Sequence, residues 1–183
     1  MKISLPKKLH TFIALFLFFC FSNVLANGLT TKSMLVSISI PAIGGVYSYT
    51  SGDIEGLKEL GLACLVTAQL TTLLKNAVHR TRPNGDNDLS FPSGHTAAAF
   101  VGASYLQHRY GMVWGIPMYA LASVIGYQRV NVKDHFWSDV IAGAALGYTA
   151  GAIFTAKYPN VWLEPTVDVE NRSYGMQINA RFG

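Results

Sequence analysis

Five long apolar stretches dominate this 183-residue chain and limit what it can fold into. Helices are expected at residues 32–50, 54–79, 95–110, 112–129 and 135–157, since each stretch is bounded by glycine, proline or polar residues. At 1.5 Å per residue they would measure about 24 to 39 Å, which brackets the hydrocarbon core of a bilayer. The sequence therefore predicts an all-α helical bundle that spans a membrane several times.

Composition favours the membrane in the same way. Half of the residues are hydrophobic and only 13% are charged, whereas ordinary soluble domains carry about 25% charged residues. A soluble, exported helical bundle is the alternative.

The first 26 residues have the three parts of a secretory signal. A basic segment, MKISLPKKLH, precedes an apolar run, TFIALFLFFCF, and the small-residue ending SNVLA suits cleavage after Ala26. An uncleaved first transmembrane helix is the alternative. Both interpretations place the protein in the cell envelope, with residues 27–160 as its helical domain.

Export also changes the charge of the mature chain. Removal of Lys2, Lys7 and Lys8 leaves 11 of the 14 basic residues against 10 acidic ones, a net charge of +1. Such a balance does not indicate a nucleic-acid partner. Cys20 lies in the signal, so Cys64 remains alone and no intrachain disulfide is expected after cleavage.

The tail, residues 161–183, changes from helical to alternating character. Val167 and Val169 alternate with acidic residues, and after polar residues 171–173 a second alternating run follows. This pattern predicts a short C-terminal β-hairpin.

Three cations at the ends of the expected helices indicate an anion site. Lys75, Arg82 and Arg129 fall on the same, outer side when the helices are counted from an exported N-terminus. Pro83 disfavours helix at Arg82 and turns that residue into the loop. Three cations around one point are typical of a site for a multiply charged anion.

Two histidine segments supply reactive groups beside these cations. Ser93 and Gly94 stand at a helix start, where backbone NH groups can hold phosphate oxygens. His135 and Asp139 are four residues apart, so we expect the carboxylate to accept a proton from one ring nitrogen and leave the other nucleophilic. His95 is then placed to protonate the departing oxygen.

The remaining polar residues of these segments have a simpler interpretation. They are expected to be solvated loop charges: Arg80, Asp86, Asp88, Lys133 and Asp134. No two-histidine helix pair or carboxylate cluster has metal-ligand spacing, so no metal cofactor is predicted.

The chain resembles the type 2 phosphatidic acid phosphatase superfamily in three motifs, K-x6-RP at 75–83, PSGH at 92–95 and R-x5-H-x3-D at 129–139. Gln128 stands where that family usually has serine. The resemblance implies that His135 forms a phosphohistidine, that Asp139 orients it and that His95 is the general acid, which later activates water. It also implies a phosphate site made by Lys75, Arg82, Ser93, Gly94 and Arg129.

The expected function is a metal-independent phosphatase that hydrolyses a phosphomonoester or pyrophosphate of a membrane lipid. Its active site would face the periplasm at the outer face of the inner membrane. A soluble periplasmic acid phosphatase acting on small phosphoesters is the first alternative. An inactive phosphate- or lipid-binding module is the second.

Overall fold

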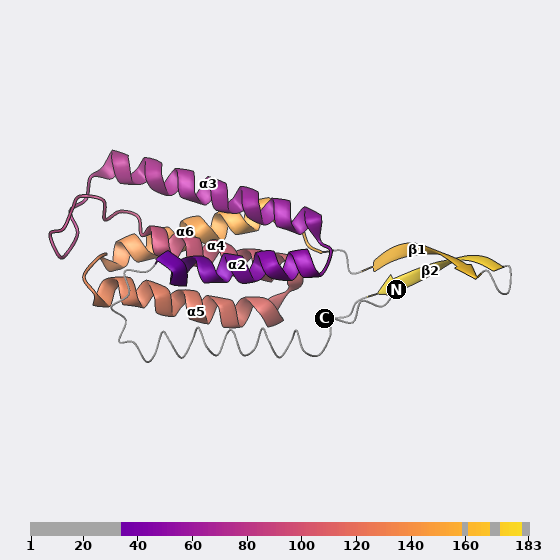
Figure 1. The fold of residues 1–183 in the computed structure, drawn as a ribbon. Helices are drawn as coiled ribbons and strands as arrows, with labels where there is room; N and C mark the ends of the chain where they lie inside the picture. Colours follow the sequence, from indigo (N-terminus) through magenta and orange to yellow (C-terminus); the bar gives the residue numbers. More distant parts are fainter. Residues whose placement is uncertain (1–33, 159–160, 169–172, 181–183) are drawn as a thin grey trace.

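The computed structural model describes residues 34–158, 161–168 and 173–180, so the predicted signal, residues 1–26, lies outside the described residues. The elements in chain order are α2 (Met34–Thr50), α3 (Ile54–Val78), α4 (Gly94–Tyr110), α5 (Met112–Asn131), α6 (Trp137–Phe154), β1 (Val161–Asp168) and β2 (Ser173–Ala180). Figure 1 shows the helices as a bundle of roughly aligned rods.

The predicted helical bundle is confirmed, with one difference that matters for function. Helices α2 to α5 begin and end within two residues of the expected positions. Helix α6, however, begins at Trp137, not at residue 135, because Phe136 is its N-cap. His135 therefore lies in the turn before the helix.

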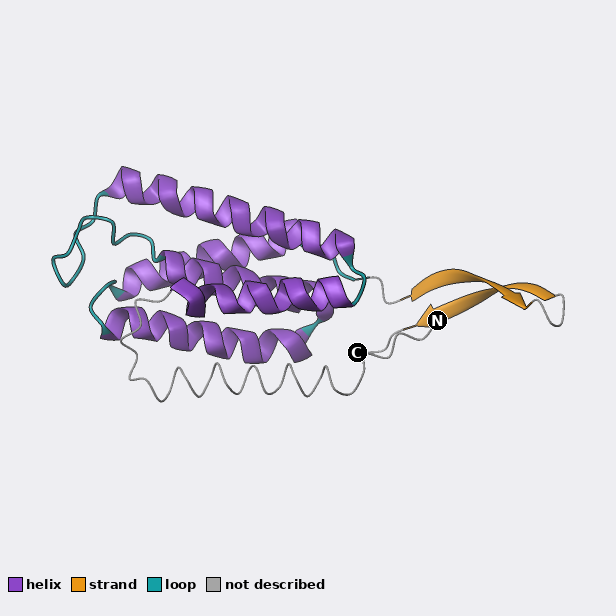
Figure 2. Cartoon of the chain, in the orientation of Figure 1, coloured by secondary structure: helices purple, strands orange, loops and turns teal. Residues whose placement is uncertain are grey.

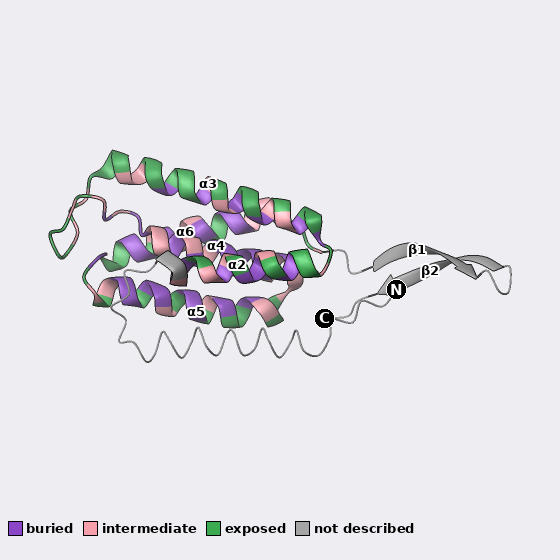
Figure 3. Cartoon of the chain, in the orientation of Figure 1, coloured by how far each residue is buried: buried purple, intermediate pink, exposed green. Residues whose placement is uncertain are grey.

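Helix α4 is the centre of the bundle and contacts the other four helices. Its sequence, GHTAAAFVGASYLQHRY, carries small or apolar side chains all round the helix, which is typical of a buried helix. Val101, Tyr105 and Leu106 are at most 1% exposed. Figure 3 shows the surrounding helices with exposed outer faces.

Glycines let α6 approach α4 backbone to backbone. Gly143, Gly147 and Gly151 recur every four residues and face α4. A Cβ on Gly143 would overlap the carbonyl oxygen of Ser93, and one on Gly147 would overlap that of Ala97. The start of α6 is thus held against the start of α4.

The opposite end of the bundle is tied by a buried ion pair. Arg109, near the end of α4, donates from Nη2 to Oδ1 of Asp53 at 2.5 Å and from Nε to Oδ2 at 2.8 Å. Asp53 also caps α3 by accepting from the backbone NH of Gly56. The pair links the α2–α3 turn to the central helix.

One helix of the described residues, α3, is long and apolar enough to cross a membrane. Only 22% of its most apolar 18-residue window is buried in the bundle. One such helix is weak evidence for spanning, so the multi-span part of the prediction stays a prediction.

Two antiparallel strands follow the helices. Strands β1 and β2 pair with Val161 opposite Ala180 and Asp168 opposite Ser173. Of the turn predicted at residues 171–173, Ser173 is the first residue of β2, and residues 171 and 172 lie outside the described residues.

Because α4 and α6 are in close contact, a single methyl group added to a glycine of α6 should lower the stability of the fold. Gly147→Ala should lower stability by about 1 to 3 kcal/mol, because its Cβ has no room beside Ala97. The measurement is the midpoint of thermal unfolding in detergent. Gly61→Ala is the matched control, since a Cβ there meets nothing within 4 Å; an equal loss in both variants would contradict the close-contact argument.

Candidate active site

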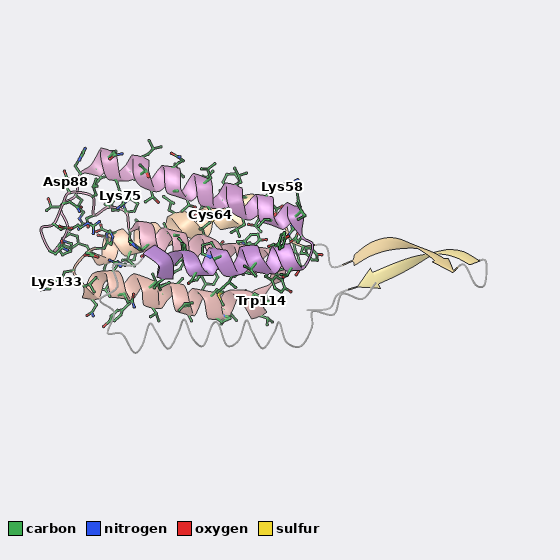
Figure 4. All side chains as sticks on the ribbon, viewed as in Figure 1. Lys58, Cys64, Lys75, Asp88, Trp114 and Lys133 are labelled. Carbon is green, nitrogen blue, oxygen red and sulfur yellow. The ribbon has the colours of Figure 1, made fainter. Side chains whose placement is uncertain are left out.

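The candidate site lies at the end of the bundle where α3 and α5 end and α4 and α6 begin. Figure 2 shows the long loop after α3 at this end. Figure 4 places Lys75, Asp88 and Lys133 there and Lys58 at the other end. Chain segments that are far apart in sequence therefore share one region.

A cavity of about 430 Å³ opens in this region, between α2, α3 and α4. One part of its wall is polar and carries two cations, Lys75 and Arg82, beside Gly94, His95 and His135. Another part, which we call the apolar arm, is lined by Ile38, Pro41, Cys64, Ala68, Ala98 and Val101. The cavity thus combines an anion-attracting wall with a hydrophobic one.

Five of the eight residues predicted for the site line this cavity, and the other three lie behind its wall. Ser93 and Asp139 have no exposed surface and Arg129 is 4% exposed. Arg129 is close enough to act electrostatically on His95.

The PSGH turn presents glycine, not serine, to the cavity. The Ser93 NH donates to the Asp139 carbonyl at 2.9 Å, and its hydroxyl lies 2.9 Å from that of Thr96. The phosphate contact expected of the Ser93 NH is therefore not what the structure shows, because α6 already uses that donor. A Cβ on Gly94 would point toward Thr71 and Lys75, so glycine keeps the cationic wall open.

Internal acceptors hold the three cations in place. Lys75 Nζ donates to the carbonyls of Leu89 at 2.6 Å and Pro92 at 2.8 Å. Asp134 forms ion pairs with Arg82, at 3.8 Å, and with Arg129. Asp134 is buried, so its expected role as a solvated loop charge is wrong.

Two buried nitrogens beside the cations have no hydrogen-bond partner among the described residues. They are Nε2 of His95 and Nε of Arg129. An unsatisfied buried polar group costs about 1 to 3 kcal/mol. Both atoms therefore favour a bound group that can hydrogen-bond with them.

His135 is held by a backbone carbonyl and not by Asp139. Its Nδ1 lies 2.7 Å from the Ser90 carbonyl oxygen, which can only accept, so Nδ1 carries the proton. Nε2 then bears the lone pair. The distance from Nδ1 to Oδ2 of Asp139 is 3.8 Å, too long for a hydrogen bond, and the predicted direct bond is wrong.

The Asp139 carboxylate is committed to other donors because it lies in the first turn of α6. It accepts from the Phe136 NH at 2.9 Å, as in a capping box, and from the Ser90 hydroxyl at 2.5 Å. Arg80 Nη1 donates to its other oxygen at 2.7 Å. The hydrogen-bonded connection from Asp139 to His135 therefore runs through Ser90.

The environment keeps His135 neutral. Burial, together with the charges of Lys75 and Arg82, lowers the pKa of His135 to about 4. The hydrogen bond to Ser90 and the charge of Asp139 oppose that shift but do not cancel it. A neutral ring with a free lone pair is the form that can act as a nucleophile.

Sequence reasoning missed Arg80, Ser90 and Asp134. Arg80 was expected to be solvated, yet it contacts the buried Asp139. Its place in the KNAVHRTRP segment was a usable signal, whereas nothing local marks Ser90, whose carbonyl matters through a contact 45 residues away.

The donor set does not fit a metal ion. Among the described residues no three His, Cys, Asp or Glu side chains gather as a metal site. The polar wall of the cavity carries Lys75 and Arg82, which attract anions and repel cations.

The similarity of this chain to known proteins points to one family. The family model of the PAP2 superfamily matches residues 56–163. The lipid A 4'-phosphatase of Helicobacter pylori strain J99 is 30% identical over 136 residues, which cover 68% of this chain and 69% of the relative. The lipid A 1-phosphatase of Porphyromonas gingivalis is 38% identical over 82 residues, 43% of this chain and 18% of that protein.

The fold is similar to a solved structure as well. The crystal structure of LpxE from Aquifex aeolicus superposes with a TM-score of 0.55 at 26% sequence identity, covering 82% of this chain and 87% of that one. The resemblance inferred from the three motifs is therefore confirmed by the family model, by the relatives and by the fold: the chain belongs to the PAP2 superfamily.

Proposed function

We propose that this protein is a metal-independent phosphatase that removes phosphate from a phosphomonoester or pyrophosphate of a membrane lipid, through a phosphohistidine on His135. The observation that carries the proposal is the cavity in which two histidines and two cations adjoin an apolar arm. The named relatives include lipid A phosphatases, so lipid A is among the candidate substrates.

In the proposed reaction, the phosphate docks against Lys75, Arg82 and the Arg129 behind them. The lone pair on Nε2 of His135 attacks phosphorus, and the bond from phosphorus to the leaving oxygen breaks as the new bond to nitrogen forms. His95 gives its proton to that oxygen. His95 then takes a proton from water, whose oxygen attacks phosphorus, breaks the bond to nitrogen and releases phosphate.

The cations couple the charge of His95 to substrate binding. Burial and the charges of Arg129, Arg82 and Lys75 oppose a positive charge on the adjacent His95 ring. A phosphate dianion between the cations would offset their repulsion, and the unpartnered Nε2 of His95 could then hold the proton that the leaving oxygen needs. The general acid is thereby charged when substrate is present.

Two features support a lipid substrate and a membrane location. The apolar arm continues from the phosphate end and suits the hydrocarbon of an amphiphile. Large apolar side chains are exposed on each of the four outer helices, for example Val46 (55%), Leu73 (63%), Ile116 (61%) and Ile153 (69%). The central helix α4, described over its whole length, has none. A bilayer would cover such a surface, which water does not favour.

We further propose that the site faces the periplasm at the inner membrane. The support is the exported N-terminus predicted from residues 1–26, combined with the alternating direction of the helices, which brings the site to one end of the bundle. Release of the folded protein by osmotic shock without detergent would favour the soluble alternative.

The nucleophile can be tested by trapping. His135→Ala should lower turnover of an aryl phosphate by about 10³-fold or more, because the attacking atom is lost. Rapid quenching of the wild-type enzyme should yield an acid-labile phosphoryl group that peptide mass spectrometry finds on His135. His79→Ala is the control, since the His79 side chain is 61% exposed; retained turnover in His135→Ala would refute the assignment.

The apolar arm can be tested by narrowing it. Ala98→Leu should reduce kcat/KM for a long-chain lipid phosphate at least tenfold more than for a small aryl phosphate, because Ala98 lines the arm. The assay compares both substrates in one detergent. Ala120→Leu, on the exposed face of α5, should change neither. Equal losses on both substrates would contradict a lipid-binding role of the arm.

The neutral state of His135 predicts how stability depends on pH. The unfolded chain binds a proton near pH 6.5, the ordinary value, while the folded chain resists it until about 4. Stability should therefore fall as pH drops from 6.5 toward 4. The measurement is Tm in detergent across this range: His135→Asn should make the fall smaller and His79→Asn should not. An unchanged slope in His135→Asn would show that the folded state does not exclude that proton.

A further inference from the structure

Arg80 lies just after α3 and reaches across to the start of α6. Its Nη1 donates to Oδ1 of Asp139 at 2.7 Å and to the Ser138 hydroxyl at 2.6 Å. Its guanidinium carbon lies 4.1 Å from the centre of the Phe136 ring. With 35% of its side chain exposed, Arg80 is oriented by three neighbouring groups of α6 and its cap.

The partner of Arg80 is a carboxylate with no exposed surface. A buried ionised carboxylate is costly unless it is paired and hydrogen-bonded. Among the described residues, the arginine and lysine side chains include one ion-pair partner of Asp139, and that partner is Arg80. The uncharged donors to Asp139 are the Ser90 hydroxyl and the Phe136 NH.

Ser90 connects this ion pair to the nucleophile. Its NH donates to the Arg80 carbonyl at 2.9 Å, and its hydroxyl donates to Asp139 at 2.5 Å. Its own carbonyl accepts from Nδ1 of His135 at 2.7 Å. Arg80 thus fixes Ser90 twice, through its backbone and through Asp139, and Ser90 fixes the ring.

We propose that Arg80 is a positioning residue for the phosphatase reaction: its ion pair with Asp139 holds the Ser90 carbonyl on Nδ1 of His135 and so fixes the orientation of the ring. This inference rests on the proposed function, since it concerns the nucleophile of that reaction. Arg80 does not line the cavity and so acts through Asp139 and Ser90.

The effect of Arg80 on the charge state of His135 follows from the charged groups around that histidine. The charged and titratable groups of the elements around it are Lys75 of α3, Arg80 and Arg82 of the loop after α3, His95 of α4, Arg129 of α5, Asp134 of the turn and Asp139 of α6. Of these, Lys75 and Arg82 oppose a positive charge on His135 and Asp139 favours it. Asp134 is engaged by Arg82 and Arg129. Without Arg80, the charge of Asp139 would be left 3.8 Å from Nδ1 of His135, where it favours the imidazolium form that cannot attack phosphorus.

The test is the pH profile of kcat for the full-length protein in detergent, with an aryl phosphate as substrate. Arg80→Gln should lower kcat by about 10 to 100-fold, with KM within about threefold, because a misplaced nucleophile loses rate more than binding. The acidic limb of the profile should also move to higher pH. Lys133→Gln is the control: Lys133 is an exposed cation at the same end of the bundle, and its loss should change neither quantity.

Two further variants separate charge from shape. Arg80→Lys keeps the positive charge and should return the acidic limb close to its wild-type position, with part of kcat restored. Arg80→Met keeps an apolar stem over Phe136 without charge and should behave like Arg80→Gln. Gel filtration in detergent checks that each variant is folded.

Three results would overturn the inference. They are a kcat within twofold of wild type in both uncharged variants, a reduced kcat with an unmoved acidic limb, and failure of both uncharged variants to fold, which would make Arg80 a folding residue. An inactive wild type or an active His135→Ala would instead contradict the proposed function. An active wild type with unaffected Arg80 variants contradicts only this inference.

Discussion

The site depends on how closely α6 approaches α4. Glycines at every fourth position of α6 bring the two backbones together, and the Ser93 NH bonds the Asp139 carbonyl across the contact. Small residues at helix interfaces are the usual means to such approach. The contact joins the PSGH turn to the start of α6, so two segments more than 40 residues apart in the sequence are held in one rigid frame.

Charge balance is the second constraint on the site. The side chains of Lys75, Arg82 and Arg129 repel one another, and acceptors within the protein offset this repulsion. Asp134 pairs with two arginines, and the carbonyls of Leu89 and Pro92 receive Lys75. In the proposed function, a phosphate would compete with these partners and would also give hydrogen-bond acceptors to the buried nitrogens that they leave unpaired.

The two histidines have different partners. His135 has Nδ1 bound to a carbonyl, which determines its tautomer and leaves the lone pair on Nε2. His95 has an unpartnered Nε2 beside the same cations. The proposed reaction uses this difference: the first ring would attack phosphorus and the second would exchange a proton, next to an apolar arm that suits an amphiphilic phosphate.

Helix positions, the family and five residues that line the cavity were readable from the sequence, because apolar runs, helix breakers and motif spacing can be recognised without the tertiary structure. The same local reasoning failed for Asp139, whose spacing from His135 suggested a direct bond, since α6 begins two residues after that histidine. It also failed for Arg80 and Asp134, which look like loop charges until their ion-pair partners are known. The sequence by itself determined which groups are available and where helices carry them. Only the tertiary structure decided which acceptor each donor meets, because hydrogen bonds are short and directional and their partners come from segments about 50 residues apart.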